Sequence, residues 1–585
     1  MSVFWTRLTS RHAWLVLLAL TLLLYLPGTG TIPLMDRDEP RFARATVEMM
    51  QRGDWVIPWF NGEYRFDKPP LTYWWMRLHF HLFGVHELAA RLHSVLSVWL
   101  VSLVVFRMGR DLGGRAAAWW GAVGWITSLQ VLVHGRLCVA DMPMVFFVSL
   151  AMLAASKLLL NDVAPSRRFS GWWWVLWGSL GLGFLAKGPI ALLVPALALG
   201  LWRLAFWRKP APWGRLQIGW GALLALALVA SWGIPALVQT EGRFWNVGVG
   251  EHVVKRGTHA FNGRGILPGY YLLSAFLSLL PWMVFLPYIW RHVRTQWDAQ
   301  RALLVAWFTA PQLIFLLYAT QLPHYTMPGF PAFFALMGVT MAHGLKHAQI
   351  PAKLGRFGAT YLGIFALLAI GIITAVWTGG FVSHLSLRLL ITSGAVMLGA
   401  LAVVGMTALR RTWTMAGIAV AILAAGLVTF GSSLRAIHPV VQMAPVLRAI
   451  LKESNAIAWQ YTEPSLVFYS DHSWTMLSKL ERVRERMQQP RTGVVVAQIS
   501  EWKLSDWWEN LFTQASSDKP SREFQEDVDA LTTATGADYT WKDISGFNAA
   551  RSSWVTVRVF VRKSPALLLP PSSGAELTVR NTGGQ

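Results

Sequence analysis

The sequence predicts a polytopic α-helical membrane protein that ends in a small soluble α/β domain. Apolar residues make up 54% of the 585 residues and charged residues only 14%, a balance that is untypical of a soluble chain of this length. The apolar residues fall in runs of about the length that crosses a bilayer. One very large soluble core is excluded, because soluble cores divide into domains whose surfaces need more charge than this chain carries.

Thirteen runs within residues 1–431 are predicted to span the membrane. They lie near 12–29, 87–107, 114–133, 140–159, 171–187, 188–206, 216–238, 269–290, 301–319, 324–343, 357–378, 383–406 and 412–431. The first run lacks a convincing small-x-small cleavage site, so we expect an uncleaved span. The short break at Lys187-Gly188-Pro189 leaves a kink or a re-entrant turn as the alternative to two adjacent spans.

The net charge of +22 is carried mainly by short loops between the apolar runs, which indicates membrane topology rather than nucleic-acid binding. With thirteen spans these loops all share one side, which is then the cytoplasm. The N-terminus is therefore predicted to be cytoplasmic, and everything after about Ser432 to lie on the other side. Cys138 is the only cysteine, which excludes a disulfide framework within the chain.

Two long loops are predicted on the non-cytoplasmic side, at residues 30–86 and 239–268. Long loops with their own pattern usually carry function. In the first loop, the spacing of apolar residues predicts helices over 39–51 and 71–83. We expect both helices to be amphipathic and to lie in the membrane interface.

The composition changes after Gly431, where charge rises and the apolar runs shorten. Residues 432–563 are predicted to form an α/β domain, with strands at 465–469, 493–499 and 554–561 and helices at 443–451 and near 474–486. The tail 564–585, rich in proline and serine near its start, is predicted to be disordered.

A dense cluster of charge follows the first span, in Asp36-Arg37-Asp38-Glu39-Pro40-Arg41. Pro40 suits the first turn of a helix, and Asp38 is predicted to cap that helix. A capped helix with solvated charges would explain the pattern without function. Because charge this dense at a membrane surface is expensive, we favour a functional site.

Further charged residues recur at the same predicted side of the membrane. Lys68 precedes two prolines that hold the backbone extended, so its ammonium suits a phosphate, with a snorkelling lysine as the alternative. Asp141 opens a span, where helix capping explains it as well as function does. Lys187 does not help topology on this side and therefore needs another reason.

The second long loop carries a polar stretch that includes Glu251, His252, Lys255, Arg256, His259 and Arg264. Gln321 to Tyr325 offer further hydrogen-bond donors at the same side. His252 and His259 with Asp67 are candidate ligands of a divalent metal. No fixed ligand spacing supports that metal, so no cofactor is predicted as required.

Four short motifs occur in order along the membrane part: Asp38-Glu39-x-Arg41-Phe42-Ala43, Asp67-Lys68-Pro69, Asp141-x-Pro143 and Gly183-Phe184-x-x-Lys187-Gly188. With them the chain resembles the bacterial aminoarabinose (4-amino-4-deoxy-L-arabinose) lipid A transferases, within the protein-mannosyltransferase-like GT-C glycosyltransferases. The resemblance covers nearly the whole membrane part and also fits the terminal soluble domain.

The resemblance implies a GT-C fold with about thirteen transmembrane helices in the bacterial inner membrane, with the C-terminal domain periplasmic. It implies inverting transfer of the sugar from undecaprenyl phosphate to lipid A. It makes Asp38 the central acid and Asp141 the second, with Glu39 beside Asp38 as a further catalytic candidate. The expected ligands of the donor phosphate are Arg41, Lys68, Lys187, Arg264 and Tyr325. A histidine expected before the next span is replaced by Arg264, which weakens the case for a metal.

Competing functions differ in where they need charge. A related transferase could use another sugar, or a protein or other glycan as acceptor. A transporter or flippase requires charged residues and broken helices near the bilayer midplane, whereas the charges here gather at one mouth. A membrane scaffold needs no coherent cluster of acidic and basic residues at all.

Overall fold

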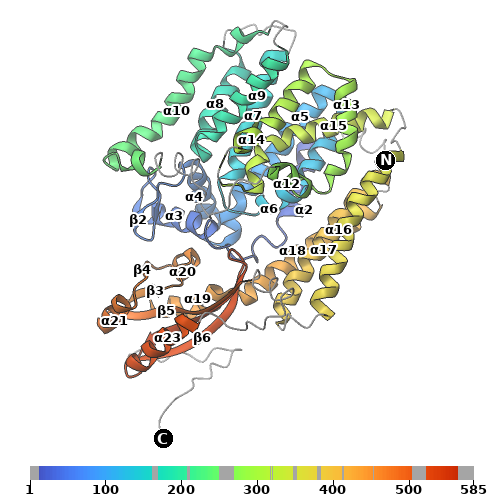
Figure 1. Cartoon of the computed structure of the whole chain (residues 1–585). Coiled ribbons are helices and arrows are strands. Elements are labelled where there is room, and N and C mark those ends of the chain that lie inside the picture. The colour runs from blue at the N-terminus through green and yellow to red at the C-terminus, as the bar shows by residue number, and fades with distance from the viewer. Residues whose placement is uncertain are drawn as a thin grey trace.

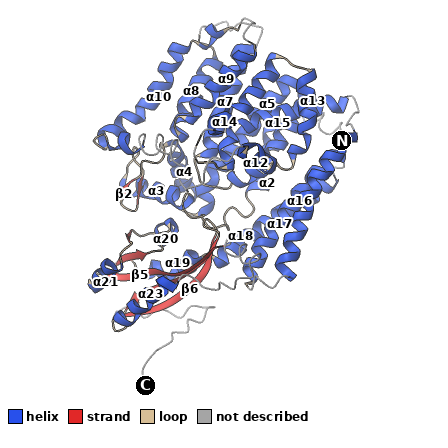
Figure 2. Ribbon diagram, in the orientation of Figure 1, coloured by secondary structure: helices blue, strands red, loops and turns tan. Residues whose placement is uncertain are grey.

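A helical bundle occupies one end of the structure and a mixed β-sheet the other (Figure 1). The computed structural model describes residues 12–160, 169–206, 211–248, 269–316, 318, 320–346, 352–378, 384–410, 414–451, 454–503 and 522–563. Apart from a small hairpin beside the bundle, the strands are confined to the C-terminal sheet (Figure 2). The two helices of the first loop, α3 (Glu39–Arg52) and α4 (Leu71–Phe83), lie between the bundle and the sheet (Figure 1).

Helices overlap all of the predicted spans. They are α2 (Ala13–Tyr25), α5 (Glu87–Ile126), α7 (Asp141–Leu160), α8 (Gly171–Lys187), α9 (Ile190–Ala205), α10 (Ile218–Gln239), α12 (Tyr270–Ser278), α13 (Leu286–Thr295), α14 (Ala299–Leu316), α15 (Phe330–Lys346), α16 (Ala352–Thr378), α17 (Leu385–Arg410) and α18 (Thr414–Ile437). Helix α5 covers two of the predicted spans, and α12 and α13 share one. Within the described residues, seven helices are long and apolar enough to cross a membrane, or eight if one bent pair counts as a single span. The chain is a multi-pass membrane protein.

Two of the predicted breaks are tight turns between antiparallel helices. Helix α5 reverses at Gly114, which has φ 78° and ψ −167°, and the indole of Trp125 in its second half donates to the carbonyl of Val98 in the first at 3.0 Å. Helices α8 and α9 reverse at Gly188, where φ is 88°. A positive φ is accessible to glycine without a steric penalty. The break after Lys187 therefore separates two helices and is not a kink.

Two spans differ from their predicted form. The span predicted at 269–290 is broken into α12 and a second segment, Trp282–Thr295, bent by 110° from it. The break falls at Pro281, which has no backbone N–H to continue the helix. The span predicted at 114–133 ends at Ile126, and a short separate helix, α6 (Leu129–His134), follows.

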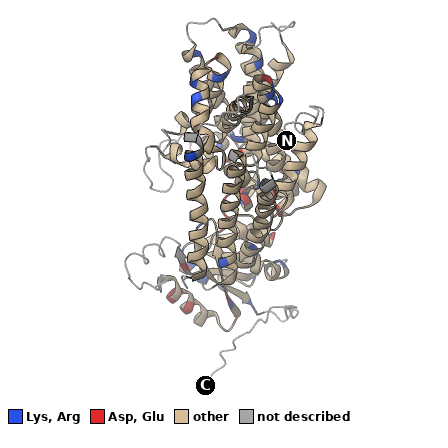
Figure 3. Ribbon diagram, turned by 90° about the vertical axis from the view of Figure 1, so that its right-hand side faces the viewer, with Lys and Arg blue, Asp and Glu red and all other residues tan. Residues whose placement is uncertain are grey.

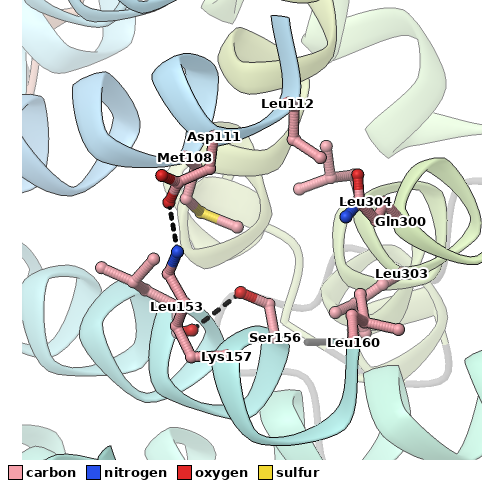
Figure 4. Close-up of a pocket in the computed structure, with 10 residues that line it drawn as sticks. All are labelled: Met108, Asp111, Leu112, Leu153, Ser156, Lys157, Leu160, Gln300, Leu303 and Leu304. Atoms are coloured by element: carbon pink, nitrogen blue, oxygen red, sulfur yellow. Dashed lines mark hydrogen bonds and ion pairs between the residues drawn. The ribbon is translucent and has the colours of Figure 1, made fainter. Parts of the chain in front are cut away.

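The end of α7 opposite Asp141 carries a polar pocket (Figure 4). There Asp111, in the turn of α5, pairs with Lys157 of α7 at 2.6 Å and with Arg107 at 3.1 Å. Leucines of α7 and α14 complete its wall. Several Lys and Arg residues gather at this end of the bundle, away from the C-terminus (Figure 3).

The C-terminal sheet has five strands in the order β4-β3-β5-β7-β6. They are β3 (Asn455–Trp459), β4 (Trp474–Leu477), β5 (Thr492–Lys503), β6 (Tyr539–Asn548) and β7 (Ser553–Arg562). Strand β3 pairs parallel with β4 and β5, and the other pairs are antiparallel. The helices are α19 (Pro439–Ile450), α20 (Pro464–Ser470), α21 (Leu480–Gln488) and α23 (Arg522–Thr535).

Alternate residues of the sheet face two cores, as the period of a strand requires. Ala456 and Val494 join a core with α19, α20 and residues of α3. Ile457 and Val495 face the opposite core, with α21 and α23. The C-terminal elements therefore share one hydrophobic core with the first loop.

Part of the predicted C-terminal pattern is wrong. The strand predicted at 465–469 is helix α20, whose residues are all buried. A short apolar run buried on every side has no period that distinguishes a strand from a helix. The helix predicted near 474–486 is strand β4 followed by α21, while β5 and β7 contain the strands predicted at 493–499 and 554–561. Helix α18 continues to Ile437, beyond the boundary predicted at 431/432.

The first loop forms α3 (Glu39–Arg52), the hairpin β1 (Trp59–Phe60) and β2 (Glu63–Tyr64), and α4 (Leu71–Phe83). Both predicted helices exist, and their position in the membrane interface stays a prediction. Ten of the fourteen residues of α3 are buried, because α4, the hairpin and α20 pack against it. Helix α4 does expose apolar side chains, with Leu78 at 55% and Leu82 at 64%.

Candidate active site

Three carboxylates at the start of α3 point to different surroundings. Asp36 and Glu39 are buried, whereas Asp38 between them is exposed. Asp38 occupies the N-cap position, yet its side chain makes no capping hydrogen bond, so the predicted capping function is wrong. The carboxylate of Asp38 is therefore not used to close the helix.

Two arginines of the first loop, Arg41 and Arg65, interact electrostatically with Asp38. Arg65 is buried, donates to the hydroxyl of Tyr73 at 3.0 Å and pairs with Asp67 at 3.1 Å. Arg41 lies within the electrostatic field of Asp38, Asp67 and Arg65. Burial and the charge of Arg65 lower the pKa of Arg41, and the two carboxylates oppose that shift. The structure thus brings together Asp38, Arg41 and Asp67, with the half-buried Lys68 next to Asp67 in the chain.

A second cluster forms where α7, α8 and the 3₁₀-helix η4 (Pro323–Gly329) meet. Asp141 is buried at the start of α7 and forms an ion pair with Lys187 at the end of α8. The Nε2 atom of His324 lies 3.9 Å from the same carboxylate, and the Lys187 ammonium lies 5.7 Å from the ring centroid of Tyr325. Three predicted site residues, Asp141, Lys187 and Tyr325, are therefore neighbours.

A line of polar side chains extends this second cluster into the bundle. The rings of His324 and His134 lie 4.6 Å apart between centroids. His134 Nδ1 is 2.8 Å from the side-chain amide of Gln130, which accepts from Ser278 at 3.0 Å. Sequence reasoning missed His134, because a lone histidine in an apolar segment carries no signal of its own.

Glu39 joins the two clusters but does not face either as a reactive group. It is 2% exposed and pairs with Arg91 of α5 at 2.7 Å. It also accepts the backbone N–H of Cys138 at 2.8 Å, three residues before Asp141 in the chain. With its oxygens engaged in this way, Glu39 is placed as part of the scaffold, and its predicted catalytic function finds no support in this position.

The C-terminal domain closes the other side of the Asp38 turn. The backbone N–H of Ser465 in α20 donates to Asp36 at 2.9 Å, and His438 Nε2 lies 3.7 Å from the second Asp36 oxygen. Nearby, Glu463 pairs with Arg551. Burial raises the pKa of Asp36 to about 6, and burial together with the charge of Asp36 raises the pKa of Glu463 to about 6.

Three of the predicted site residues, Arg264, His252 and His259, lie outside the described residues. Asp67, the third candidate metal ligand, pairs with Arg65. Within the described part of the chain, no three His, Cys, Asp or Glu side chains converge in a way that could hold a metal. A metal site completed by the two histidines stays a prediction.

Comparison with known proteins decides the family. A model of the dolichyl-phosphate-mannose-protein mannosyltransferase family matches residues 67–234. The chain is 30% identical over 422 residues to the undecaprenyl phosphate-alpha-4-amino-4-deoxy-L-arabinose arabinosyl transferase of Aeromonas salmonicida, an alignment that covers 69% of this chain and 74% of that protein. The chain belongs to this arabinosyl transferase family.

Other members of the arabinosyl transferase family match over a shorter length. The protein of the same description from Erwinia tasmaniensis is 31% identical over 358 residues, which cover 59% of this chain and 62% of that protein. The chain thus spans a little under two thirds of that relative.

Solved structures give the fold of this arabinosyl transferase family member. The crystal structure of ArnT from Cupriavidus metallidurans in the apo state has a TM-score of 0.68 at 20% identity, and it covers 94% of this chain and 98% of that one. The structure of the same protein bound to undecaprenyl phosphate has a TM-score of 0.67 at 21% identity. The chain therefore has the polytopic helical GT-C fold of these structures.

Proposed function

We propose that this protein is an inverting glycosyltransferase that moves 4-amino-4-deoxy-L-arabinose from undecaprenyl phosphate to a phosphate of lipid A. Membership of the arabinosyl transferase family carries the proposal. The two charged clusters support it, because acidic and basic side chains gather in the first loop and again where α7, α8 and η4 meet, and Glu39 bonds to the loop before Asp141.

Departure of undecaprenyl phosphate leaves negative charge that fixed cations must stabilise. In our proposal Arg41 and Lys68 hold the phosphate from the first loop, and Lys187 and Tyr325 approach it from α8 and η4. Arg264 is a further candidate from the second loop. The cations are held by packing and by neighbouring carboxylates before the donor arrives, which lowers the cost of reorganisation during the reaction.

We propose that Asp38 orients the donor sugar, through its amino group. A lipid A phosphate is already ionised near neutral pH, so it needs no general base to become a nucleophile. A sugar or serine hydroxyl acceptor would need one. The position of Asp38, exposed and unused by the helix cap, supports either function, and the acceptor decides between them.

The proposed topology has thirteen spans in the bacterial inner membrane, a cytoplasmic N-terminus and a periplasmic C-terminal domain. The Lys and Arg residues that gather near the polar pocket of Asp111 and Lys157 support a cytoplasmic position for that end of α7. Asp141 at the other end of α7 then lies toward the periplasm, where modification of lipid A with a lipid-linked sugar requires it.

The test is transfer by the purified protein in liposomes that contain lipid A and undecaprenyl phosphate-linked 4-amino-4-deoxy-L-arabinose. Mass spectrometry of lipid A should show an added pentosamine with the wild type and none with Asp38→Asn. The second candidate, transfer from a polyprenyl-phosphate sugar to a protein or other glycan, is favoured by the mannosyltransferase family match over residues 67–234. Unmodified lipid A together with a labelled protein or glycan in the same membranes would establish that candidate instead.

A further inference from the structure

We propose that Glu39 and Arg91 form a buried positioning pair that fixes Asp38 relative to Asp141. The inference rests on the proposed glycosyl transfer, because it assigns a function to the geometry of the two acids in that reaction. Neither member of the pair touches the substrate in this proposal. The pair acts through the hydrogen bonds that it makes to the segment before Asp38 and to the loop before Asp141.

Arg91 holds the segment that leads into the Asp38 turn. Its guanidinium is 0% exposed and donates to the carbonyls of Thr29, Ile32 and Pro33 at 2.7 to 2.8 Å. It also donates to both carboxylate oxygens of Glu39, at 2.8 and 2.7 Å. A planar guanidinium with five donors can serve several acceptors in fixed directions, which a lysine ammonium cannot do.

Glu39 connects that segment to the loop before Asp141. Its carboxylate accepts the backbone N–H of Met35 at 3.0 Å and the backbone N–H of Cys138 at 2.8 Å. The thiol of Cys138 in turn donates to the Glu39 carbonyl at 3.3 Å. One carboxylate therefore bonds to groups on both sides of the site, directly beside Asp38 and three residues before Asp141.

The turn between these anchors is strained. Arg37 has φ 78°, in the left-handed region that a residue with a long side chain rarely adopts. Such a conformation persists only where the surroundings determine it. The anchors on the two sides are Glu39 and Asp36, and the turn presents the exposed side chains of Arg37 and Asp38 between them.

An ordinary stabilising ion pair is the alternative, and α3 itself provides the matched control. Glu48 is also buried, pairs with Arg44 at 3.0 Å, and accepts the backbone N–H groups of Asn61 and Gly62 at 2.9 and 3.1 Å. Its chemistry matches that of Glu39, but its arginine lies on α3 itself and its backbone partners lie in the β1–β2 hairpin, so it bonds neither to the segment before Asp38 nor to the loop before Asp141. Loss of Glu48 should affect folding without affecting the position of Asp38.

The experiment compares Glu39→Gln and Glu48→Gln in the full-length protein, each with and without Asp38→Asn, at matched amounts of folded protein. We expect Glu39→Gln to lower kcat by about 10²-fold, as misplacement by about 1 Å does, with KM changed by less than about threefold. In the Glu39→Gln background, Asp38→Asn should cost less than about one tenth of its cost in the wild type, because the two residues are coupled. In the Glu48→Gln background, the cost of Asp38→Asn should be unchanged. An equal cost of Asp38→Asn in all backgrounds would overturn the proposal.

A second variant covers the case in which Glu39→Gln does not fold. Glu39→Asp keeps the charge beside Arg91 but is one methylene too short to reach Arg91 and Cys138 together. We expect folded protein with the same fall in kcat. Wild-type kcat in folded Glu39→Asp would contradict the positioning function.

Hydrogen exchange supplies a readout that needs no substrate. The Glu39 variants should raise exchange in both 29–38 and 136–141, and Glu48→Gln should raise it only within 44–62. Unchanged exchange at 136–141 in the Glu39 variants would overturn the proposal. If the wild type transfers no aminoarabinose, the proposed function fails, and the exchange data alone decide whether the pair couples the two loops.

Discussion

The backbone N–H of Ser465 donates a hydrogen bond to the carboxylate of Asp36 at 2.9 Å, which ties the C-terminal domain to the turn that carries Asp38. Asp36 is buried in this contact, and His438 and Glu463 face it from the same domain. The domain therefore contacts the site through a titratable group. Its docking should respond to pH.

The wild type should lose stability as pH rises, because the buried Asp36 ionises. Asp36→Asn should not show this loss, because asparagine does not ionise. Burial raises the pKa of Asp36 from its ordinary 3.8 to about 6, so its contribution is full below about pH 4 and is lost as pH rises through 6. The shift corresponds to at most about 3 kcal/mol. Asparagine keeps the acceptor for Ser465 and imitates the protonated acid at every pH.

The measurement is thermal unfolding of wild type and Asp36→Asn between pH 5 and 7.5. The Tm of the variant minus that of the wild type should increase with pH. The difference between the two proteins is needed because His438 titrates in the opposite sense: burial and Arg435 lower its pKa to about 4, so it costs stability as pH falls below about 6.5. A difference that stays constant across this range would contradict the prediction.

Asp38→Asn should abolish most transfer and leave the fold intact. The side chain is exposed and makes no helix cap, so the free energy of unfolding should change by less than about 0.5 kcal/mol. Loss of its contact with the donor should lower kcat/KM by about 10²-fold or more. Undiminished transfer of labelled sugar in membranes that contain the variant would remove Asp38 from the mechanism.

Lys187→Met should cost both stability and activity. It leaves the buried Asp141 carboxylate without its ion pair, a loss of about 3–5 kcal/mol for a buried pair. The double variant Asp141→Asn/Lys187→Met should regain much of the stability but none of the transfer, because the proposed phosphate ligand is still missing. Thermal unfolding and the transfer rate per folded protein separate the two effects.

Lys157→Met is the control for this experiment on the other end of the same helix. Lys157 also pairs with an aspartate, Asp111, at 2.6 Å, but this carboxylate is 28% exposed, against 9% for Asp141, and it keeps Arg107 as a second partner. Partly exposed pairs contribute about 1 kcal/mol or less. The control should therefore fold nearly as well as the wild type, and its transfer rate should not change. An equal fall in transfer for both variants would show that Lys187 acts through stability alone.

Local patterns predicted the elements of this fold well where burial follows a period. Helices α3 and α4 begin at Glu39 and Leu71, as the apolar spacing and the prolines beside them indicate. Alternate residues of strand β7, Val555, Val557 and Val559, lie in the core with α19 and α20, and Phe560 faces the opposite core. Helix α20 was predicted as a strand, because all its side chains are buried and the run has no period.

The candidate site was predictable only in part, because contacts between distant segments leave no local pattern in the sequence. Charge on one side of the membrane identified Asp38, Arg41, Asp141 and Lys187. The structure groups them in two clusters, which Glu39 connects through its bond to Cys138. Arg91 gave no such signal, because its partner Glu39 is 52 residues away in the chain. Contacts between distant segments, such as Ser465 with Asp36, require the tertiary structure.

Gly338→Ala should disrupt the contact between α15 and α5. A Cβ at Gly338 would lie 2.2 Å from the backbone oxygen of Ala117 and 2.9 Å from the backbone nitrogen of Gly121, and backbone atoms cannot move aside as a side-chain tip can. Small residues allow such close approach of membrane helices, so we expect a loss of about 1–3 kcal/mol from overpacking. Gly178→Ala on α8 is the control, because a Cβ there meets nothing within 4 Å, and alanine favours a helix over glycine. The Tm of the purified protein should fall for Gly338→Ala and hold or rise for Gly178→Ala; equal Tm values would mean that α5 and α15 do not depend on this contact.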